Sequence, residues 1–252
     1  MNINGTLNLN KPRGHTSYDI VRLVKKLTRQ KRVGHGGTLD PLASGVLPIC
    51  IGQATRVTQF LAEADKSYEA EVVLGVATDT YDAEGKVVKT EDPSSITYED
   101  VEEALRSFRG SIEQVPPMYS AVKHEGKRLY ELARQGVVVE RKKRSTVIHR
   151  LEILKWDPPA VTLEVECGRG AYIRSLADDL GRGLGCGAHL KNLVRLSTGP
   201  FHIGDSQDPD QFFDAVEQGR WQEQLYPVDF AVQELDAAVI DQKSERAVLS
   251  GQ

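Results

Sequence analysis

The stretch GHGGTLDPLASGVLPICIG, residues 34–52, joins a glycine-rich loop to a short apolar segment. Three glycines among its first four residues open backbone conformations that other residues avoid. Pro41 disfavours a helical conformation at Asp40, so we expect Asp40 in a stiffened, extended loop. The run from Gly45 to Gly52 is almost wholly apolar, which predicts a strand buried on both faces. The stretch therefore predicts a carboxylate held at the mouth of a buried strand, a suitable place for chemistry.

Loop chemistry alone also allows a structural role, in which Asp40 only accepts a hydrogen bond from a nearby amide. A resemblance separates the two interpretations. The stretch is similar to the GHTGTLDPxAxGVL signature of the TruB-type tRNA pseudouridine synthases, in which the aspartate is the catalytic residue. Gly36 stands where that family usually has threonine, and we expect this change to remove a hydroxyl and loosen the loop.

Further motifs of this family follow in its order along nearly the whole chain. They are KPRGHTS at 11–17, KSY at 66–68, PPMYSAVK at 116–123, GAYIRSL at 170–176 and HLKNLVR at 189–195. The resemblance implies catalytic roles for Asp40, Tyr68 and Arg174. It implies substrate-binding roles for His35, Tyr68, Tyr172, Leu193 and Lys11.

Each role has a concrete form by resemblance. The tyrosine at position 68 stacks on the target base, while Tyr172 and Leu193 border the base pocket. Arg174 pairs with the catalytic aspartate, and His35 occupies the loop space that the extruded base vacates.

Local patterns offer plainer interpretations for two of these residues. Tyr68 begins a run in which apolar residues alternate with glutamates, so it could be a core tyrosine of a strand. Arg174 lies one helical turn before Asp178 and could pair with it at the surface.

Charge is segregated along the chain, although the formal net charge is only −4. Residues 11–32 contain eight basic residues and one acid, and residues 123–150 contain nine basic residues and three acids. Eleven acids and three basic residues follow from position 205 to the end. The two basic regions could follow an RNA backbone or could be solvated surface. By resemblance, residues 123–150 form a thumb-like basic insertion that grips the T-arm of tRNA, with backbone contacts from Arg141, Lys142, Lys143 and Arg144.

The remaining composition limits the kinds of site and the cellular location that we expect for the protein. Three scattered cysteines are too few for a disulfide framework, and no apolar run approaches membrane-spanning length. The six histidines show no short ligand spacing, so no metal site is predicted. We expect a soluble, cytoplasmic protein that acts as a monomer, without a protein partner or a membrane.

Alternating strands interspersed with helices predict an α+β fold with a large mixed, mostly antiparallel sheet flanked by helices, and the resemblance agrees. We expect a catalytic domain over residues 1–228, with the basic insertion at 123–150. Residues 229–252 resemble the start of a C-terminal RNA-binding domain that is cut short.

The resemblance implies isomerisation of uridine 55 in the T-loop of tRNA to pseudouridine, without a cofactor. Attack of Asp40 on the base, attack on the sugar, or removal of a ribose proton all remain open. One alternative is a non-catalytic tRNA-binding or RNA-folding module that uses the same basic surfaces. Another is the RNA-guided branch of the family, which acts inside a ribonucleoprotein.

Overall fold

The computed structural model describes residues 3–236 and 238–250, so parts of the expected 1–228 and 229–252 segments lie outside the described residues. Thirteen strands are present in this part of the chain. They are β1 (Gly5–Lys11), β2 (Val33–His35), β3 (Ser44–Ile51), β4 (Lys66–Leu74), β5 (Val76–Thr78), β6 (Val87–Thr90), β7 (Gly110–Gln114), β8 (Lys123–His124), β9 (Lys127–Arg128), β10 (Arg144–Asp157), β11 (Ala160–Cys167), β12 (Ala188–Thr198) and β13 (Phe201–His202). The α-helices are α1 (Ser17–Thr28), α2 (Thr58–Glu63), α3 (Tyr98–Arg106), α4 (Leu129–Arg134), α5 (Ile173–Gly183), α6 (Pro209–Glu217) and α7 (Gln242–Leu249).

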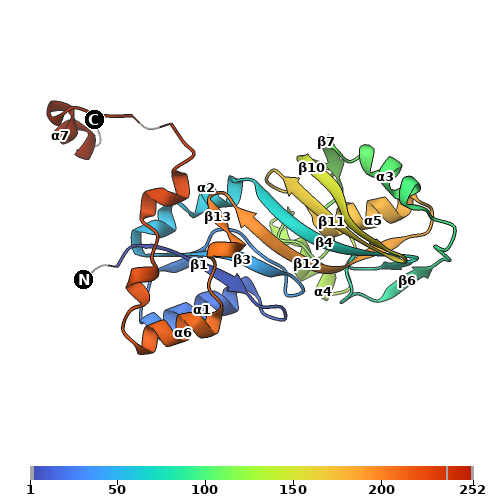
Figure 1. Ribbon diagram of the computed structural model, residues 1–252, viewed down its shortest axis with the longest axis horizontal. Coiled ribbons are helices and arrows are strands. Elements are labelled where there is room, and N and C mark those ends of the chain that lie inside the picture. Colours follow the sequence, from blue (N-terminus) through green and yellow to red (C-terminus); the bar gives the residue numbers. More distant parts are fainter. Residues whose placement is uncertain (1–2, 237, 251–252) are drawn as a thin grey trace.

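A nine-stranded sheet forms the centre of the molecule (Figure 1). Its main path runs β1-β3-β12-β4-β11-β10-β7, while β2 joins at β3 and β13 at β12. The β12–β3 pair is parallel and the other pairs in this sheet are antiparallel. The predicted α+β fold with a mixed, mostly antiparallel sheet is therefore confirmed.

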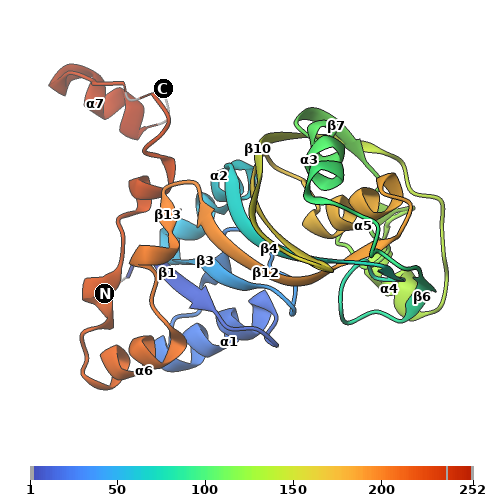
Figure 2. The ribbon, with the colours of Figure 1, turned by 45° about the vertical axis from the view of Figure 1, so that its right-hand side comes forward.

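Two helix pairs cover different parts of the sheet. In Figure 2, β4, β12 and β10 curve around α5 and α3, whereas α1 and α6 lie beside β1 at the other end. A capping box between Thr16 and Asp19 begins α1, and its buried side includes Ile20, Val21 and Val24 as the sequence predicted. The short connection from α5 to β12 depends on Gly181, where an added Cβ would lie 2.1 Å from the amide nitrogen of Ala188.

The strands that carry the site have the predicted burial. From Val46 to Ile51, all residues of strand β3 are buried, as expected for a strand covered on both faces. Strand β11 alternates between buried and half-buried residues, which matches its alternation of apolar and polar residues. Tyr68 lies on the buried face of β4, near the beginning of that strand.

A 3-10 turn, Gly52–Arg56, precedes the short helix α2. The basic insertion is not one unit, because residues 123–143 form the β8–β9 hairpin, α4 and a loop, whereas residues 144–150 belong to β10 of the main sheet. Met118, Leu129 and Leu132 give the hairpin and α4 a small core of their own.

The C-terminal segment leaves the sheet gradually. A 3-10 helix at Val228–Val232 still packs Phe230 and Ala231 against Phe201. Beyond it, residues 238–250 contain α7 but not the expected strand. In both ribbon views α7 lies away from the sheet (Figures 1 and 2).

Candidate active site

The loop between β2 and β3 that carries Asp40 is fastened to the start of α1. The Ser17 hydroxyl donates to the Leu39 carbonyl over 3.2 Å and accepts from the Leu39 amide over 2.8 Å. The Gly14 amide donates to the Pro41 carbonyl over 2.8 Å. Hydrogen bonds therefore hold the residues on both sides of Asp40, which fixes the direction of its side chain.

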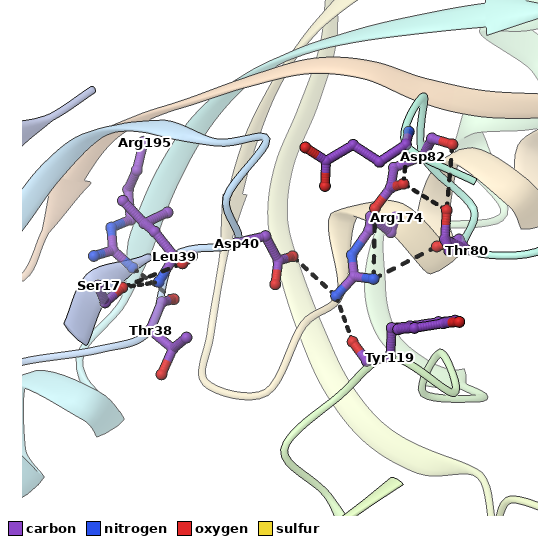
Figure 3. A network of polar contacts seen from close by, with 10 residues as sticks. Ser17, Thr38, Leu39, Asp40, Thr80, Asp82, Tyr119, Arg174 and Arg195 are labelled. Carbon is purple, nitrogen blue, oxygen red and sulfur yellow. Dashed lines mark hydrogen bonds and ion pairs between the residues drawn. The ribbon is translucent and has the colours of Figure 1, made fainter. Parts of the chain in front are cut away.

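Arg174, in the first turn of α5, lies between two carboxylates (Figure 3). Its Nη2 is 2.9 Å from Asp40 Oδ2, and its Nη1 is 3.6 Å from Asp82 Oδ2. The arginine side chain is 5% exposed, whereas that of Asp40 is 39% exposed. Nη2 also donates to the Tyr119 carbonyl, over 2.9 Å. A buried cation thus holds one carboxylate that faces open space and a second that is itself buried.

The surface pairing of Arg174 with Asp178 is absent. Asp178 instead pairs with Arg182, at 2.6 Å, one turn further along α5. Asp178 is buried where α5 packs against the protein, and this burial raises its pKa to about 6.

A cavity of about 310 Å³ opens beside Asp40. Tyr68, Tyr172, Arg174 and Leu193 line it together with Asp40. These five residues come from distant parts of the sequence, and the structure brings them to one place. Its size suits a single planar base with part of its ribose.

The two cavity tyrosines are held in different ways. Tyr68 is 8% exposed, and burial raises the pKa of its hydroxyl to about 12, so the phenol is neutral at physiological pH. Tyr172 precedes α5, and its main-chain amide and carbonyl bond the side chain of Gln114 over 2.9 and 3.2 Å. Burial also raises the pKa of Tyr172. Both rings are therefore neutral walls for a base.

A second cavity, of about 360 Å³, lies on the other side of the Asp40–Arg174 pair. Asp82, Lys86 and Arg134 are among its lining residues. Because Asp40 and Arg174 line both cavities, the pair lies between them.

Lys11 and His35 do not line the cavity beside Asp40. The Lys11 ammonium lies beneath the loop and donates to the carbonyls of Pro12 and His15 over 3.0 and 2.7 Å. Burial lowers its pKa to about 8, against a smaller opposing effect of Asp40. The His35 ring accepts a hydrogen bond from the Gly37 amide over 3.3 Å, and burial lowers its pKa. Lys11 therefore supports the turn beneath the Asp40 loop, and its contact with substrate stays a prediction.

The basic residues expected at the RNA backbone surround a separate hollow of about 540 Å³ in the insertion. Arg141, Lys142 and Arg144 line it, with Lys123 and His124 opposite. Lys143 points to Glu113, at 3.5 Å. The insertion therefore offers a cluster of surface cations apart from the Asp40 cavity.

Comparison with known proteins identifies the family. Residues 25–173 match the model of the N-terminal domain of the TruB family of pseudouridylate synthases, and residues 174–239 match the C-terminal domain of tRNA pseudouridylate synthase B. A "tRNA pseudouridine synthase B" of Dehalococcoides mccartyi is 48% identical over 249 residues, which are 99% of this chain and 83% of the relative. The chain belongs to the TruB family of pseudouridylate synthases.

Further relatives agree with this assignment. A "tRNA pseudouridine synthase B" of Clostridium acetobutylicum is 47% identical over 99% of this chain and 84% of the relative. Among solved structures, a chain of a Cbf5-Nop10-Gar1 complex is 31% identical with a TM-score of 0.78, covering 98% of this chain and 67% of that chain. A chain of an H/ACA ribonucleoprotein bound to a substrate RNA containing 2'-deoxyuridine is 28% identical with a TM-score of 0.76, at the same coverage. The fold of this TruB-family chain is thus shared with proteins that work inside ribonucleoproteins.

Sequence reasoning missed two residues of this TruB-family site. Asp82 lies in a loop that resembles the family, but no pattern showed that it would face Arg174. Arg195 ends the HLKNLVR motif and is fully buried behind the Asp40 loop. The alternation of strand β12, which places Arg195 on the same buried face as Leu193, was the available signal, since a buried charge needs a specific partner.

Gly36, the departure from the family signature, is compensated by packing. An added Cβ would lie 2.7 Å from Cδ1 and 2.8 Å from Cβ of Leu61. The Gly36 amide donates to the Pro48 carbonyl over 2.8 Å. Leu61 thus fills the space of the usual side chain and the loop is held in place, so the expected loosening is not seen.

No group of His, Cys, Asp and Glu side chains within residues 3–236 and 238–250 could hold a metal ion. In the same residues, no helix has the length and apolar character needed to cross a membrane.

Proposed function

We propose that this protein isomerises uridine 55 in the T-loop of tRNA to pseudouridine. The observation that carries the proposal is the Asp40–Arg174 pair at a base-sized cavity walled by Tyr68, Tyr172 and Leu193. It occurs in a chain 44–53% identical to relatives named "tRNA pseudouridine synthase B". Family membership supports pseudouridylation, and these names support tRNA as the substrate.

The reaction breaks the bond from ribose C1′ to N1 of uracil, turns the base within the pocket and joins C1′ to C5. A proton leaves C5 and another is taken up at N1, so atoms and charge balance without a redox partner. The base must first leave its stack, because Asp40 cannot reach the reacting carbons inside a folded loop. The 310 Å³ cavity is the receiving space.

Asp40 acts in its ionised form, adding to the base, adding to the sugar or removing a ribose proton. Arg174 holds the carboxylate by a charge-assisted hydrogen bond and balances its charge where water has been expelled. Asp82 completes the network behind the arginine. The buried network therefore fixes the orientation of the Asp40 carboxylate.

The cavity walls hold the base. Tyr68 stacks on the uracil, and Tyr172 and Leu193 close the sides. His35 fills the position in the RNA loop that the uridine leaves. Its place in β2, two residues before Gly37, supports this role because the ring is already held near the loop.

The RNA backbone is bound elsewhere on the molecule. Arg141, Lys142, Lys143 and Arg144 contact phosphates of the T-arm, which their exposed or half-buried positions permit. We infer a catalytic unit over residues 1–228 and the start of a C-terminal RNA-binding domain over 229–252. We also infer that the protein acts in the cytoplasm as a monomer without a protein partner.

Two other functions make different predictions. A non-catalytic tRNA-binding module needs the basic surfaces but not the Asp40–Arg174 pair. An RNA-guided synthase resembles the solved ribonucleoprotein chains, but those are only 28–31% identical, below the relatives named for tRNA. The stand-alone enzyme is therefore favoured.

The test is pseudouridine mapping on unmodified tRNA incubated with the isolated protein. We expect one modified site, at position 55, and no product on a transcript with cytidine at that position. Binding without product would support the module, and activity only after addition of a guide RNA would support the ribonucleoprotein branch. Product at another uridine would overturn the site specificity.

A further inference from the structure

Arg195 in β12 is a charged side chain with no access to solvent. Its relative exposure is 0%, and it is the largest fully buried side chain among the described residues. A guanidinium in such a place is costly unless its donors are paired. Among the described residues it forms no ion pair with a carboxylate, so its partners must be neutral acceptors.

Those acceptors come from both arms of the Asp40 loop. Nη2 donates to the Gly37 carbonyl over 3.2 Å and Nη1 to the Thr38 carbonyl over 3.4 Å, just before Asp40. Nε donates to the Val46 carbonyl over 2.7 Å, after it. Figure 3 shows Arg195 beside Thr38 and Leu39, with Arg174 on the other side of Asp40. One side chain therefore fastens the two ends of the loop.

The main chain of Arg195 also approaches the loop closely. Gly45 pairs with Arg195 where β3 and β12 run parallel. Gly45 has φ +104°, and an added Cβ would lie 2.2 Å from the Arg195 carbonyl oxygen. The end of the loop can therefore pack directly against the main chain of Arg195 only because Gly45 has no side chain.

The cross-strand neighbour of Arg195 in β4 is Tyr68. Both side chains line the cavity beside Asp40. Arg195 therefore joins the Asp40 loop to the strand that carries Tyr68.

We propose that Arg195 is a positioning residue that fixes the Asp40 loop relative to Tyr68 on the neighbouring strand. The inference rests on the proposed function, since it names what holds two of its groups together. Lysine in place of arginine keeps the charge but cannot reach three carbonyls from one planar fork.

The first experiment measures single-turnover rate, tRNA Kd and Tm for Arg195→Lys. We expect the rate to fall about 100-fold, as for a small misplacement of reacting groups, with Kd changed less than about twofold. Arg109→Lys is the matched control, because Arg109 donates from Nε and Nη2 to the Leu151 carbonyl away from the site. The proposal is wrong if the Arg195→Lys rate stays within twofold of wild type, or if rate and Kd deteriorate equally.

The second experiment uses the wild-type protein and does not depend on folding of a variant. Selective labelling of tyrosine and arginine allows NMR contacts between the Arg195 guanidinium and the Tyr68 ring to be detected, with Tyr68→Phe assigning the signal. We expect such contacts, and their absence would overturn the inference. Failure of wild type to modify position 55 would instead remove the proposed function while leaving this structural contact measurable.

Discussion

The Asp40 cavity and the basic insertion use charge in opposite ways. Beside the cavity, Arg174 and its partner Asp82 are buried, their side chains only 5% and 6% exposed. In the insertion, Lys142, Lys143 and Arg144 are exposed, and the one ion pair of Lys143 is a long surface contact. Buried charges need particular partners, whereas exposed charges act mainly through their number.

The difference follows from what each region must do. Chemistry at one carbon atom requires a carboxylate held to within a fraction of an ångström, so its support must be buried and specific. Binding a phosphate backbone requires only positive charge along a path, so flexible side chains suffice. Conservative substitutions should therefore be severe in the cavity and mild, additive and salt-dependent in the insertion.

The strongest test of this contrast is Asp40→Asn. Loss of the negative charge removes the reacting group, and we expect pseudouridine formation to fall about 10⁴-fold with tRNA Kd within about threefold. Tritium release from uridine-labelled tRNA measures the rate. Asp157→Asn, at an exposed position of β10, serves as control and should be unchanged. Turnover near the wild-type rate in Asp40→Asn would refute the assignment.

Asp82→Asn tests whether the buried partner of Arg174 matters although it does not face the base cavity. Asparagine keeps an oxygen for the bonds from Thr80 and the Glu84 amide but removes the charge near Arg174. We expect a 10- to 100-fold lower single-turnover rate and little change in Kd, because Arg174 is left with Asp40 alone. Asp79→Asn, in the same second cavity but bonded to the Lys86 amide, is the control. Equal rates in the two variants would show that Asp82 plays no part.

The insertion is tested by replacing Arg141, Lys142, Lys143 and Arg144 with glutamine. We expect weaker tRNA binding and a logarithmic salt slope smaller by roughly 0.7 to 0.9 for each phosphate that is no longer bound, with the rate at saturating tRNA within about threefold. Filter binding across a salt series measures this slope. Glutamine at Lys89 and Lys155, which pair with their own neighbouring acids, should leave it unchanged. A slope equal to wild type in the fourfold variant would exclude phosphate binding by these residues.

The smallest expected effect concerns the buried ammonium of Lys11. Its pKa is lowered from 10.5 to about 8, so between these values the unfolded chain binds more protons and the free energy of unfolding rises with pH. Lys11→Met should reduce that rise by about 2 kcal/mol between pH 7.5 and pH 10. The pKa of Lys66 is also lowered to about 8, so Lys66 still contributes to the rise of the unfolding free energy with pH in the Lys11→Met variant.

Urea unfolding at pH 7.5 and pH 10 measures this difference. The range stops at pH 10 because the raised pKa of Tyr68 acts in the opposite direction above it. Lys26→Met, on the exposed face of α1, is the control. The same increase with pH in both variants would show that Lys11 does not carry the effect.

Much of this arrangement could be predicted before the structure. The apolar run after Asp40 predicted β3, and the alternation that begins at Tyr68 predicted β4, because both patterns depend on residues close in the chain. The motifs named Asp40, Tyr68, Tyr172 and Leu193, which line one cavity. Charge composition could not show that residues 144–150 of the expected insertion pair with β7 and β11 in the main sheet.

The sequence by itself determined which chemical groups are present and which local elements carry them. The resemblance also implied the pairing of Arg174 with Asp40. Only the tertiary structure decided the other partners, since Arg174 also faces Asp82 rather than Asp178, and Arg195 reaches the Asp40 loop beside Tyr68. The physical reason is that a buried charge must be satisfied by whatever acceptors the packed sheet and helices bring within reach, and spacing along the chain does not specify these.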